Sequence, residues 1–214
     1  MHYVSSVKFS PDMKQLHVGE CVAESYGRQT LSDRPSLGGE DCTIRSFDMD
    51  SLPIWGKSLG GTGPFRAAVP LLDGVSVLAC DDFGIWRWDL DDGHVENVSF
   101  EGHSEHLASI QSASISPHGT LVATSGMDRT VMIWQVDTGK VLHGPLEGYS
   151  DSIFALSFSA DGKMVASGSD DRKVWVWSAE TGLRVCGPME GHTGSVRGIC
   201  FRCVLYSLYS KTRA

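Results

Sequence analysis

The stretch Gly168-Ser169-Asp170-Asp171-Arg172-Lys173-Val174-Trp175-Val176-Trp177 repeats the pattern of a stretch that lies 43 residues earlier, Ser125-Gly126-Met127-Asp128-Arg129-Thr130-Val131-Met132-Ile133-Trp134, with the same Asp, Arg, Val and Trp at equivalent positions. The two copies lead to Gly187-Pro188-Met189-Glu190-Gly191 and Gly144-Pro145-Leu146-Glu147-Gly148, again 43 residues apart. A repeated unit of this size cannot bury its apolar face alone and has to stack on its neighbours. The repeat therefore indicates a fold that is built from stacked units.

Two further units precede these copies. Alternating strands end at Trp88 and at Phe47, as they do at Trp134 and Trp177. Alternation of this kind sends one set of side chains to each face of a sheet. Six residues before each closing aromatic stands an aspartate, and the four are Asp41, Asp82, Asp128 and Asp171. The same spacing in four places indicates four related units.

Each unit also opens with an apolar strand that ends in turn residues such as Ser159-Ala160-Asp161-Gly162, after which the next strand begins. Four short strands in a period of this length are typical of a β-propeller blade. We predict an all-β chain in which four four-stranded antiparallel blades and the start of a fifth form an open arc. The expected blades are 1–61, 62–102, 103–148, 149–191 and a partial 192–201, with an insert loop at 20–39 and an off-pattern tail at 202–214.

Composition limits the function. The formal net charge is -8, with 18 Lys and Arg against 26 Asp and Glu. A nucleic-acid groove or an anionic membrane surface calls for a basic stripe, so neither partner is expected. The first residues lack the apolar run of a signal peptide. These observations predict a protein of the cytoplasm, with the nucleus as an alternative, and reduced cysteines.

The repeated motifs resemble those of the WD-repeat propellers, closely in blades 3 and 4 and loosely in blades 1 and 2. The Gly-Pro-(Leu/Met)-Glu-Gly linker is also similar to the repeat arrays of fungal signalling proteins that carry a nucleotide-binding domain ahead of the propeller. In the family, a hydrogen-bond chain of Trp, Ser or Thr, His and Asp holds each blade. The resemblance implies that this network uses Thr124, Asp128 and Trp134 in blade 3, and Ser167, Asp171, Trp177 and Tyr149 in blade 4. The histidine of blade 3 is either His106, which is in register by count, or His103, which follows Gly102 but lies three residues early.

Two departures from the pattern qualify this expectation. Blade 2 has Leu78 where we expect the hydroxyl, and blade 1 closes with Phe47, which cannot donate a hydrogen bond. A hydrolytic triad is the alternative interpretation of the His-Ser-Asp sets, but no enzyme needs a copy in every blade. We therefore expect no catalytic residues, no metal site and no cofactor.

Family propellers commonly bind partners on the face around the central channel. The resemblance implies that this face displays the residue before each turn aspartate and the residues that open the inner strands. The predicted partner-binding residues are Tyr3, Glu40, Phe65, Asp81, Gln111, Met127, Phe154, Asp170 and Arg197. Aromatic residues and arginine are enriched in interface hot spots.

The sequence thus predicts a non-catalytic scaffold that binds a protein or peptide partner. One alternative is a sensing or regulatory fragment of a larger signalling protein, and a less favoured one is an enzyme on a propeller scaffold. Four blades and one strand fall short of the seven that are usual in the family, and the tail after Phe201 leaves the pattern. We therefore expect a truncated or partial propeller that self-associates or has its ring completed by another chain.

Overall fold

The structure is a computed structural model that describes residues 2–9, 15–22, 43–48, 58–60, 66–80, 85–89, 95–96 and 110–201. Within these ranges the regular elements are all β-strands. Side chains are described for 66–80, 85–89 and 110–201. No helix in these ranges is long and apolar enough to cross a membrane.

The strands of the first two sheets follow one another along the chain. The first sheet contains β1 (His2–Phe9), β2 (Gln15–Val22), β3 (Thr43–Asp48) and β4 (Ser58–Gly60). The second contains β5 (Ala67–Pro70), β6 (Ser76–Cys80), β7 (Ile85–Asp89) and β8 (Val95–Glu96).

The two copies that define the repeat form the third and fourth sheets. The third contains β9 (Ile110–Ile115), β10 (Leu121–Gly126), β11 (Val131–Gln135) and β12 (Val141–Leu146). The fourth contains β13 (Ile153–Phe158), β14 (Met164–Ser169), β15 (Val174–Ser178) and β16 (Arg184–Met189). Every pairing in the four sheets is antiparallel, so each sheet is a four-stranded meander.

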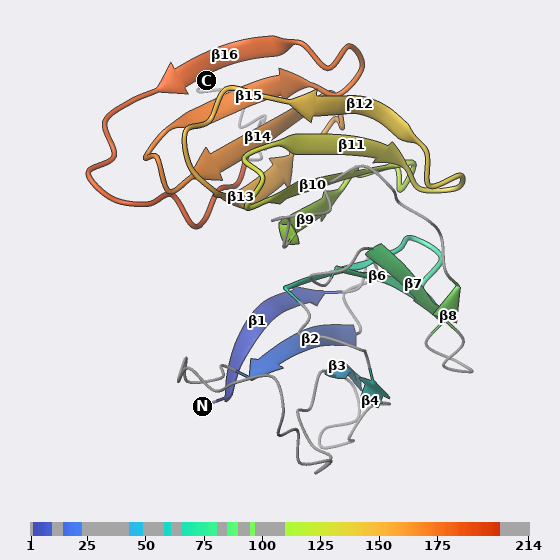
Figure 1. Cartoon of the computed structure of the whole chain (residues 1–214). Coiled ribbons are helices and arrows are strands. Elements are labelled where there is room, and N and C mark those ends of the chain that lie inside the picture. The colour runs from blue at the N-terminus through green and yellow to red at the C-terminus, as the bar shows by residue number, and fades with distance from the viewer. Residues whose placement is uncertain are drawn as a thin grey trace, which may run out of the picture.

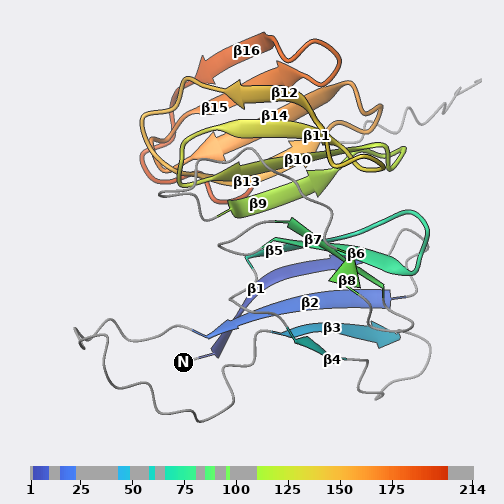
Figure 2. The same cartoon turned by 45° about the vertical axis from the view of Figure 1, so that its right-hand side comes forward.

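The four blades are arranged as an open arc. The first strands of successive blades are neighbours, because β1 contacts β5, β5 contacts β9 and β9 contacts β13. Figures 1 and 2 show the sheets in chain order, with β1–β4 at one end of the arc and β13–β16 at the other. The predicted all-β fold of propeller blades in an open arc is confirmed.

The hairpin between the first two strands of a blade is stabilised by its turn residues. In blade 4 the Ser159 hydroxyl donates to Asp161 at 2.6 Å and accepts the Met164 amide at 2.9 Å. Gly162 has a φ of 70°, a conformation that glycine adopts at no steric cost. Gly119 and Gly74 have φ values of 71° and 75° at the equivalent turns of blades 3 and 2.

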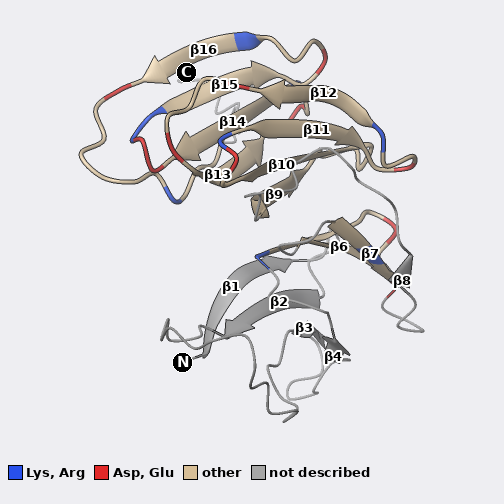
Figure 3. Cartoon of the chain, viewed as in Figure 1, with Lys and Arg blue, Asp and Glu red and all other residues tan. Residues whose placement is uncertain are grey.

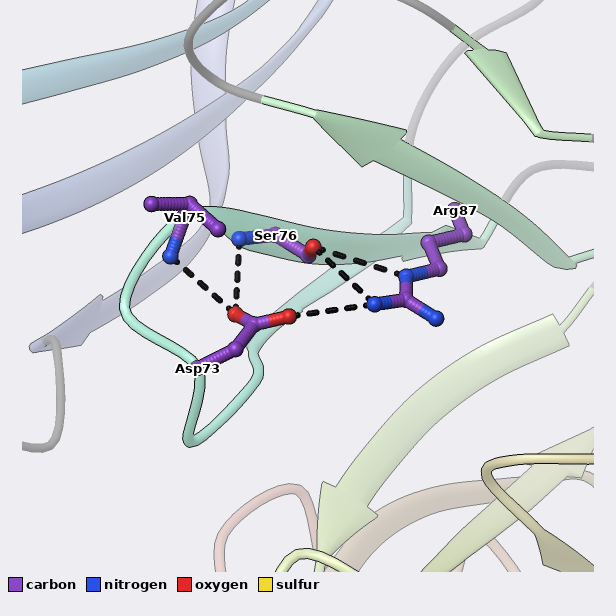
Figure 4. A network of polar contacts seen from close by, with 4 residues as sticks. All are labelled: Asp73, Val75, Ser76 and Arg87. Atoms are coloured by element: carbon purple, nitrogen blue, oxygen red, sulfur yellow. Dashed lines mark hydrogen bonds and ion pairs between the residues drawn. The ribbon is translucent and has the colours of Figure 1, made fainter.

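In blade 2 the position of the turn serine is Leu71, and the ion-paired Asp73 takes over the hydrogen bonding of the turn (Figure 4). Asp73 accepts the amides of Val75 and Ser76 at 3.1 and 2.9 Å, and Arg87 Nη2 lies 3.1 Å from its second carboxylate oxygen. Burial raises the pKa of Asp73, but the hydrogen bonds from Ser76 and Val75 and the charge of Arg87 together hold it below its ordinary value. The turn of blade 2 thus includes a carboxylate that is stabilised in its charged form.

The core consists of layers between successive blades. One cluster joins Leu78, Cys80 and Ile85 of blade 2 to Val122, Met132 and Trp134 of blade 3. A second joins the opposite face of blade 3, with Ala123, Val131 and Ile133, to Val165, Trp175 and Trp177 of blade 4. Blades 2, 3 and 4 therefore each have two different faces, one with the closing tryptophan and one with smaller aliphatic side chains.

The pairing of β6 with β7 shows that the residue predicted at the hydroxyl position of blade 2 was wrong. Trp88 pairs with Val77, so the residue equivalent to Thr124 and Ser167 is Ala79 rather than Leu78. Ala79 lies in one cluster with Trp88, whereas Leu78 packs on the opposite face against blade 3. A shift of one residue moves a side chain to the other face of a sheet, which explains the error. Blade 2 still lacks a hydroxyl at this position.

Two predicted boundaries are also wrong. The insert expected at 20–39 begins inside β2, because this strand pairs with β1 as far as Val22 opposite His2. The expected opening strand of a fifth blade, 192–201, forms no β-strand. A β-strand needs a partner strand, whereas this segment reaches blade 4 through the Val196 amide, which donates to the Ser169 carbonyl at 3.0 Å. The tail at 202–214 lies outside the described residues.

Candidate functional site

The structure brings together three of the four residues predicted to hold blade 4. The Trp177 indole donates to the Ser167 hydroxyl at 2.7 Å. Tyr149 Oη lies 2.7 Å from both the hydroxyl and the carbonyl oxygen of Ser167 and accepts the Trp175 amide at 3.1 Å. Burial raises the pKa of Tyr149, so this hydroxyl keeps its proton and remains a donor.

Asp171 is separate from this chain of hydrogen bonds. We expected its carboxylate within reach of Ser167 and Trp177, but it accepts the Ser150 amide at 2.9 Å and the Lys173 amide at 3.0 Å. The physical reason is the residue at 149, where the phenol of tyrosine bonds the serine directly. The carboxylate therefore stabilises the turn and the loop that enters blade 4.

In blade 3 the Trp134 indole donates to the Thr124 hydroxyl at 2.8 Å, and both side chains are fully buried. Asp128 accepts the Thr130 amide at 3.1 Å within its turn. His106, the predicted fourth member, and its alternative His103 lie outside the described residues. The buried Thr124 and Ser167 hydroxyls are inaccessible to a substrate, so this arrangement suits a structural role better than a nucleophilic one.

Three residues predicted for the partner-binding face form a cluster at the end of blade 4. Arg197 Nη2 lies 3.1 Å from Asp170 Oδ2, and the Arg197 guanidinium carbon lies 4.3 Å from the centre of the Phe154 ring. The exposed fraction of the side chain is 63% for Arg197 but 21% for Asp170. Asp170 Oδ1 is buried without a hydrogen-bond partner. The cluster thus turns its cationic member toward solvent.

Met127 and Gln111 occupy the equivalent positions one blade earlier. Met127 is 48% exposed in the turn after β10, and Gln111 is half-buried near the start of β9. Tyr3 lies in β1, where the structure describes only the backbone. The remaining predicted residues of this face, Glu40, Phe65 and Asp81, lie outside the described residues.

Two exposed arginines of this end of the molecule were missing from the predicted set. Arg129 and Arg172 follow the turn aspartates and have φ values of 65° and 71°. This left-handed conformation is uncommon for a residue with a Cβ atom and occurs mostly in turns. Their identity at equivalent positions of both repeats is the signal that could have revealed them.

An apolar groove of about 310 Å³ lies at the opposite ends of the inner strands. Its walls come from blades 2, 3 and 4 and include Val69, Leu72, Ile115 and Phe158. The hydroxyls of Ser116 and Ser159 in its lining accept backbone amides of their own turns. Among the described residues, no three His, Cys, Asp or Glu side chains cluster as metal ligands.

Comparison with known families and proteins adds an independent observation. The model of the family "WD domain, G-beta repeat" matches residues 94–135 and 139–178, which span strands of blades 3 and 4. These are the two blades in which the Trp–hydroxyl hydrogen bonds are described. The family motif and the geometry thus coincide.

Several curated proteins are similar to the chain. Protein groucho of Drosophila melanogaster is 29% identical over 160 residues, covering 72% of this chain and 18% of that protein. Transducin-like enhancer protein 2 of Mus musculus is 30% identical over 131 residues, covering 59% and 16%. Eukaryotic translation initiation factor 3 subunit I of Phaeosphaeria nodorum is 36% identical over 55 residues, covering 23% and 17%. The chain thus spans less than a fifth of the length of each.

Proposed function

We propose that this chain, which belongs to the WD-repeat family, is a non-catalytic scaffold that binds a protein or peptide partner on one face of its propeller arc. The face comprises the ends of the inner strands and the turns that carry Met127, Phe154, Asp170 and Arg197. In this proposal the protein acts in the cytoplasm or the nucleus, and its partner is neither a nucleic acid nor a membrane.

The observation that carries this proposal is the cluster of Phe154, Asp170 and Arg197. An arginine that lies over an aromatic ring and is paired with a carboxylate has lost part of its side-chain freedom before any partner arrives. When a partner binds such a preordered side chain, less side-chain conformational entropy is lost on association. Arginine and aromatic residues are also the side chains whose truncation most often weakens an interface.

The comparisons support binding rather than catalysis in one respect. A relative whose name describes a subunit of a translation initiation factor is, by that name, a component of an assembly. Within this chain, the hydroxyls that resemble a catalytic set are buried and already hydrogen bonded. Neither observation favours an enzyme.

A second candidate is the sensing or regulatory portion of a larger signalling protein. The observation that favours it is the small share of each relative that the chain spans, 18% for groucho and 16% for transducin-like enhancer protein 2. In this case the same face would bind either another part of the same protein or a separate partner. A partner that completes the ring is part of both candidates.

Affinity capture from native extract, with quantitative mass spectrometry, tests the proposal. The wild-type chain is compared with the Arg197→Ala variant and with the Met127→Ala variant, both of which remove exposed side chains. We expect each variant to lose a defined set of captured proteins by about tenfold or more, as for an interface hot spot. The melting temperature should stay close to that of the wild type.

The matched control is Lys163→Ala, which removes an exposed charge from a turn at the opposite end of the strands. This variant should capture the same proteins as the wild type. Equal capture by the wild type and all three variants would overturn the assignment of this face.

A further inference from the structure

We infer that the partner segment carries an acidic side chain next to a bulky apolar one, with its carboxylate on Arg197 and its apolar group on Met127 and Phe154. This inference rests on the proposed function and specifies the chemistry of the partner. It follows from which side chains of this face are exposed and which are already hydrogen bonded within the protein.

Arg197 is held by local contacts that leave part of its guanidinium exposed. Arg197 uses Nη2 for its ion pair with Asp170, and one face of its guanidinium lies over Phe154. The rest of this planar group has solvent access, since 63% of the side chain is exposed. A guanidinium offers five donors in a fixed fork that matches the two oxygens of a carboxylate. Arg197 is thus held in place with donors available to an acidic partner.

The carboxylates at the same ends of the strands are engaged by nearby groups. Asp128 accepts an amide of its own turn, and Asp171 accepts one amide of its turn and one of the loop before β13. Asp170 is mostly covered, and its Oδ1 is buried. The acidic groups of these turns are therefore occupied by local contacts and compete little for a basic partner.

Exposed arginines lie in the same turns as these carboxylates. Arg129 and Arg172 are exposed in the turns that follow β10 and β14. Glu147 and Glu190 come directly after β12 and β16, the outermost strands, and so belong to the outer margin of the blades. Figure 3 shows basic and acidic residues together in the loops of blades 3 and 4. Asp151, in the loop before β13, is exposed as well. Three exposed arginines, Arg129, Arg172 and Arg197, outnumber it, so the exposed charge of the described inner turns is positive on balance, which favours a carboxylate.

Met127 and Phe154 offer apolar surface on the same face. Met127 is 48% exposed, and Phe154 is half-buried beneath Arg197. Methionine is flexible and polarizable, so it adapts to apolar groups of different shape. A phenylalanine or leucine beside the acidic residue of the partner would cover both side chains, and exclusion of water would strengthen the charge pair.

Three labelled peptides test the inference with the full chain. They are Gly-Ser-Glu-Phe-Gly-Ser and the two matched peptides in which Gln or Lys replaces Glu. We expect titrations followed by fluorescence anisotropy to show about tenfold tighter binding of the Glu peptide than of the Gln peptide. In Arg197→Ala this ratio should fall below about twofold, and Arg197→Glu should favour the Lys peptide.

Arg184→Ala is the matched control, because Arg184 also lies over an aromatic ring, 4.4 Å from the centre of Trp175, but on the outermost strand. It should keep the preference for the Glu peptide. Equal binding of the Glu and Gln peptides, or tighter binding of the Lys peptide by the wild type, would overturn the inference. Absence of binding by all three peptides at millimolar concentration would also overturn it, whereas the capture experiment would still decide the proposed function.

Discussion

Tyr149 replaces the histidine that the family resemblance implies, and it alters the hydrogen bonding of blade 4. Its hydroxyl lies 2.7 Å from the Ser167 hydroxyl and accepts the Trp175 amide, while its ring meets that of Trp175 edge to face. The phenol thus links a middle strand, β14, to the next strand, β15, inside the protein. One buried hydroxyl therefore forms hydrogen bonds with both the Ser167 hydroxyl and the Trp175 amide.

We predict that Tyr149→Phe lowers the free energy of unfolding by about 1–3 kcal/mol, because the buried groups around the hydroxyl lose their partner. Asp171→Ala should lower it by a smaller amount, because the amides of Ser150 and Lys173 can turn to water at the surface. Urea denaturation of both variants at neutral pH measures the difference. A larger loss in Asp171→Ala would contradict this ranking.

Among the elements, the turn between β5 and β6 has Leu71 where blades 3 and 4 have serine, and the nearby Asp73 supplies the hydrogen bonds instead. Asp73 accepts two backbone amides and pairs with Arg87, which comes from β7. Its pKa is depressed, so the folded chain binds the proton less readily than the unfolded chain. The contribution of Asp73 is present above the ordinary value of 3.8 and is lost as the pH falls toward the folded value.

We predict that acidification from about pH 7 to about pH 3 destabilises the wild type more than the Asp73→Asn variant. Asparagine keeps an acceptor oxygen but has no charge to lose. The measurement is the free energy of unfolding of both proteins at each pH, from urea titrations. An equal loss in the two proteins would show that this turn does not contribute to the acid sensitivity.

The strands illustrate what the sequence could predict and what it could not. The repeat placed β9–β16 well, because alternation and turn residues coincide in both copies. It misplaced the hydroxyl position of blade 2, because β6 and β7 are joined with a different spacing and only the pairing of Val77 with Trp88 sets the register. It also missed the length of β2, whose pairing with β1 continues past a bulge between Val4 and Ser6. Register depends on partner strands, which a linear pattern does not contain.

The same distinction applies to the candidate site. The family resemblance, applied to equivalent positions of the repeats, predicted Phe154, Asp170 and Arg197 for one face. Their mutual contacts could not be predicted, because Arg197 and Asp170 are far apart in sequence and meet only when the segment after blade 4 lies against its face. The prediction that Asp171 reaches Ser167 was wrong, because the phenol of Tyr149 bonds Ser167 directly.

At the scale of the whole molecule, the arc ends in a sheet whose outermost strand is uncovered. All six residues of β16 are exposed, and so is Leu183 before it. Val185 and Met189 are 56% and 42% exposed, whereas Leu146, the equivalent of Met189 in blade 3, packs against the core shared with blade 4. An exposed apolar stripe of this kind favours association.

We predict that the 214-residue chain on its own is not a stable monomer and self-associates at micromolar concentration. Light scattering after size-exclusion chromatography should give a mass above the 23.2 kDa of one chain. Val185→Lys should lower this mass, because a charge on the exposed stripe opposes apolar contact. Leu142→Lys, at the equivalent position of blade 3, is the matched control. A sharp monomer peak for the wild type, with cooperative melting, would contradict the prediction.

The two unlike faces of blades 2, 3 and 4 have a consequence for how such a chain can change in length. The aromatic face of blade 4 meets the aliphatic face of blade 3, and blade 3 meets blade 2 in the same sense. A duplicated or deleted segment of one whole period would therefore bring complementary faces together again at the new junction. Recombination between the two copies would therefore change the number of blades while the kind of contact surface between neighbouring blades stays the same.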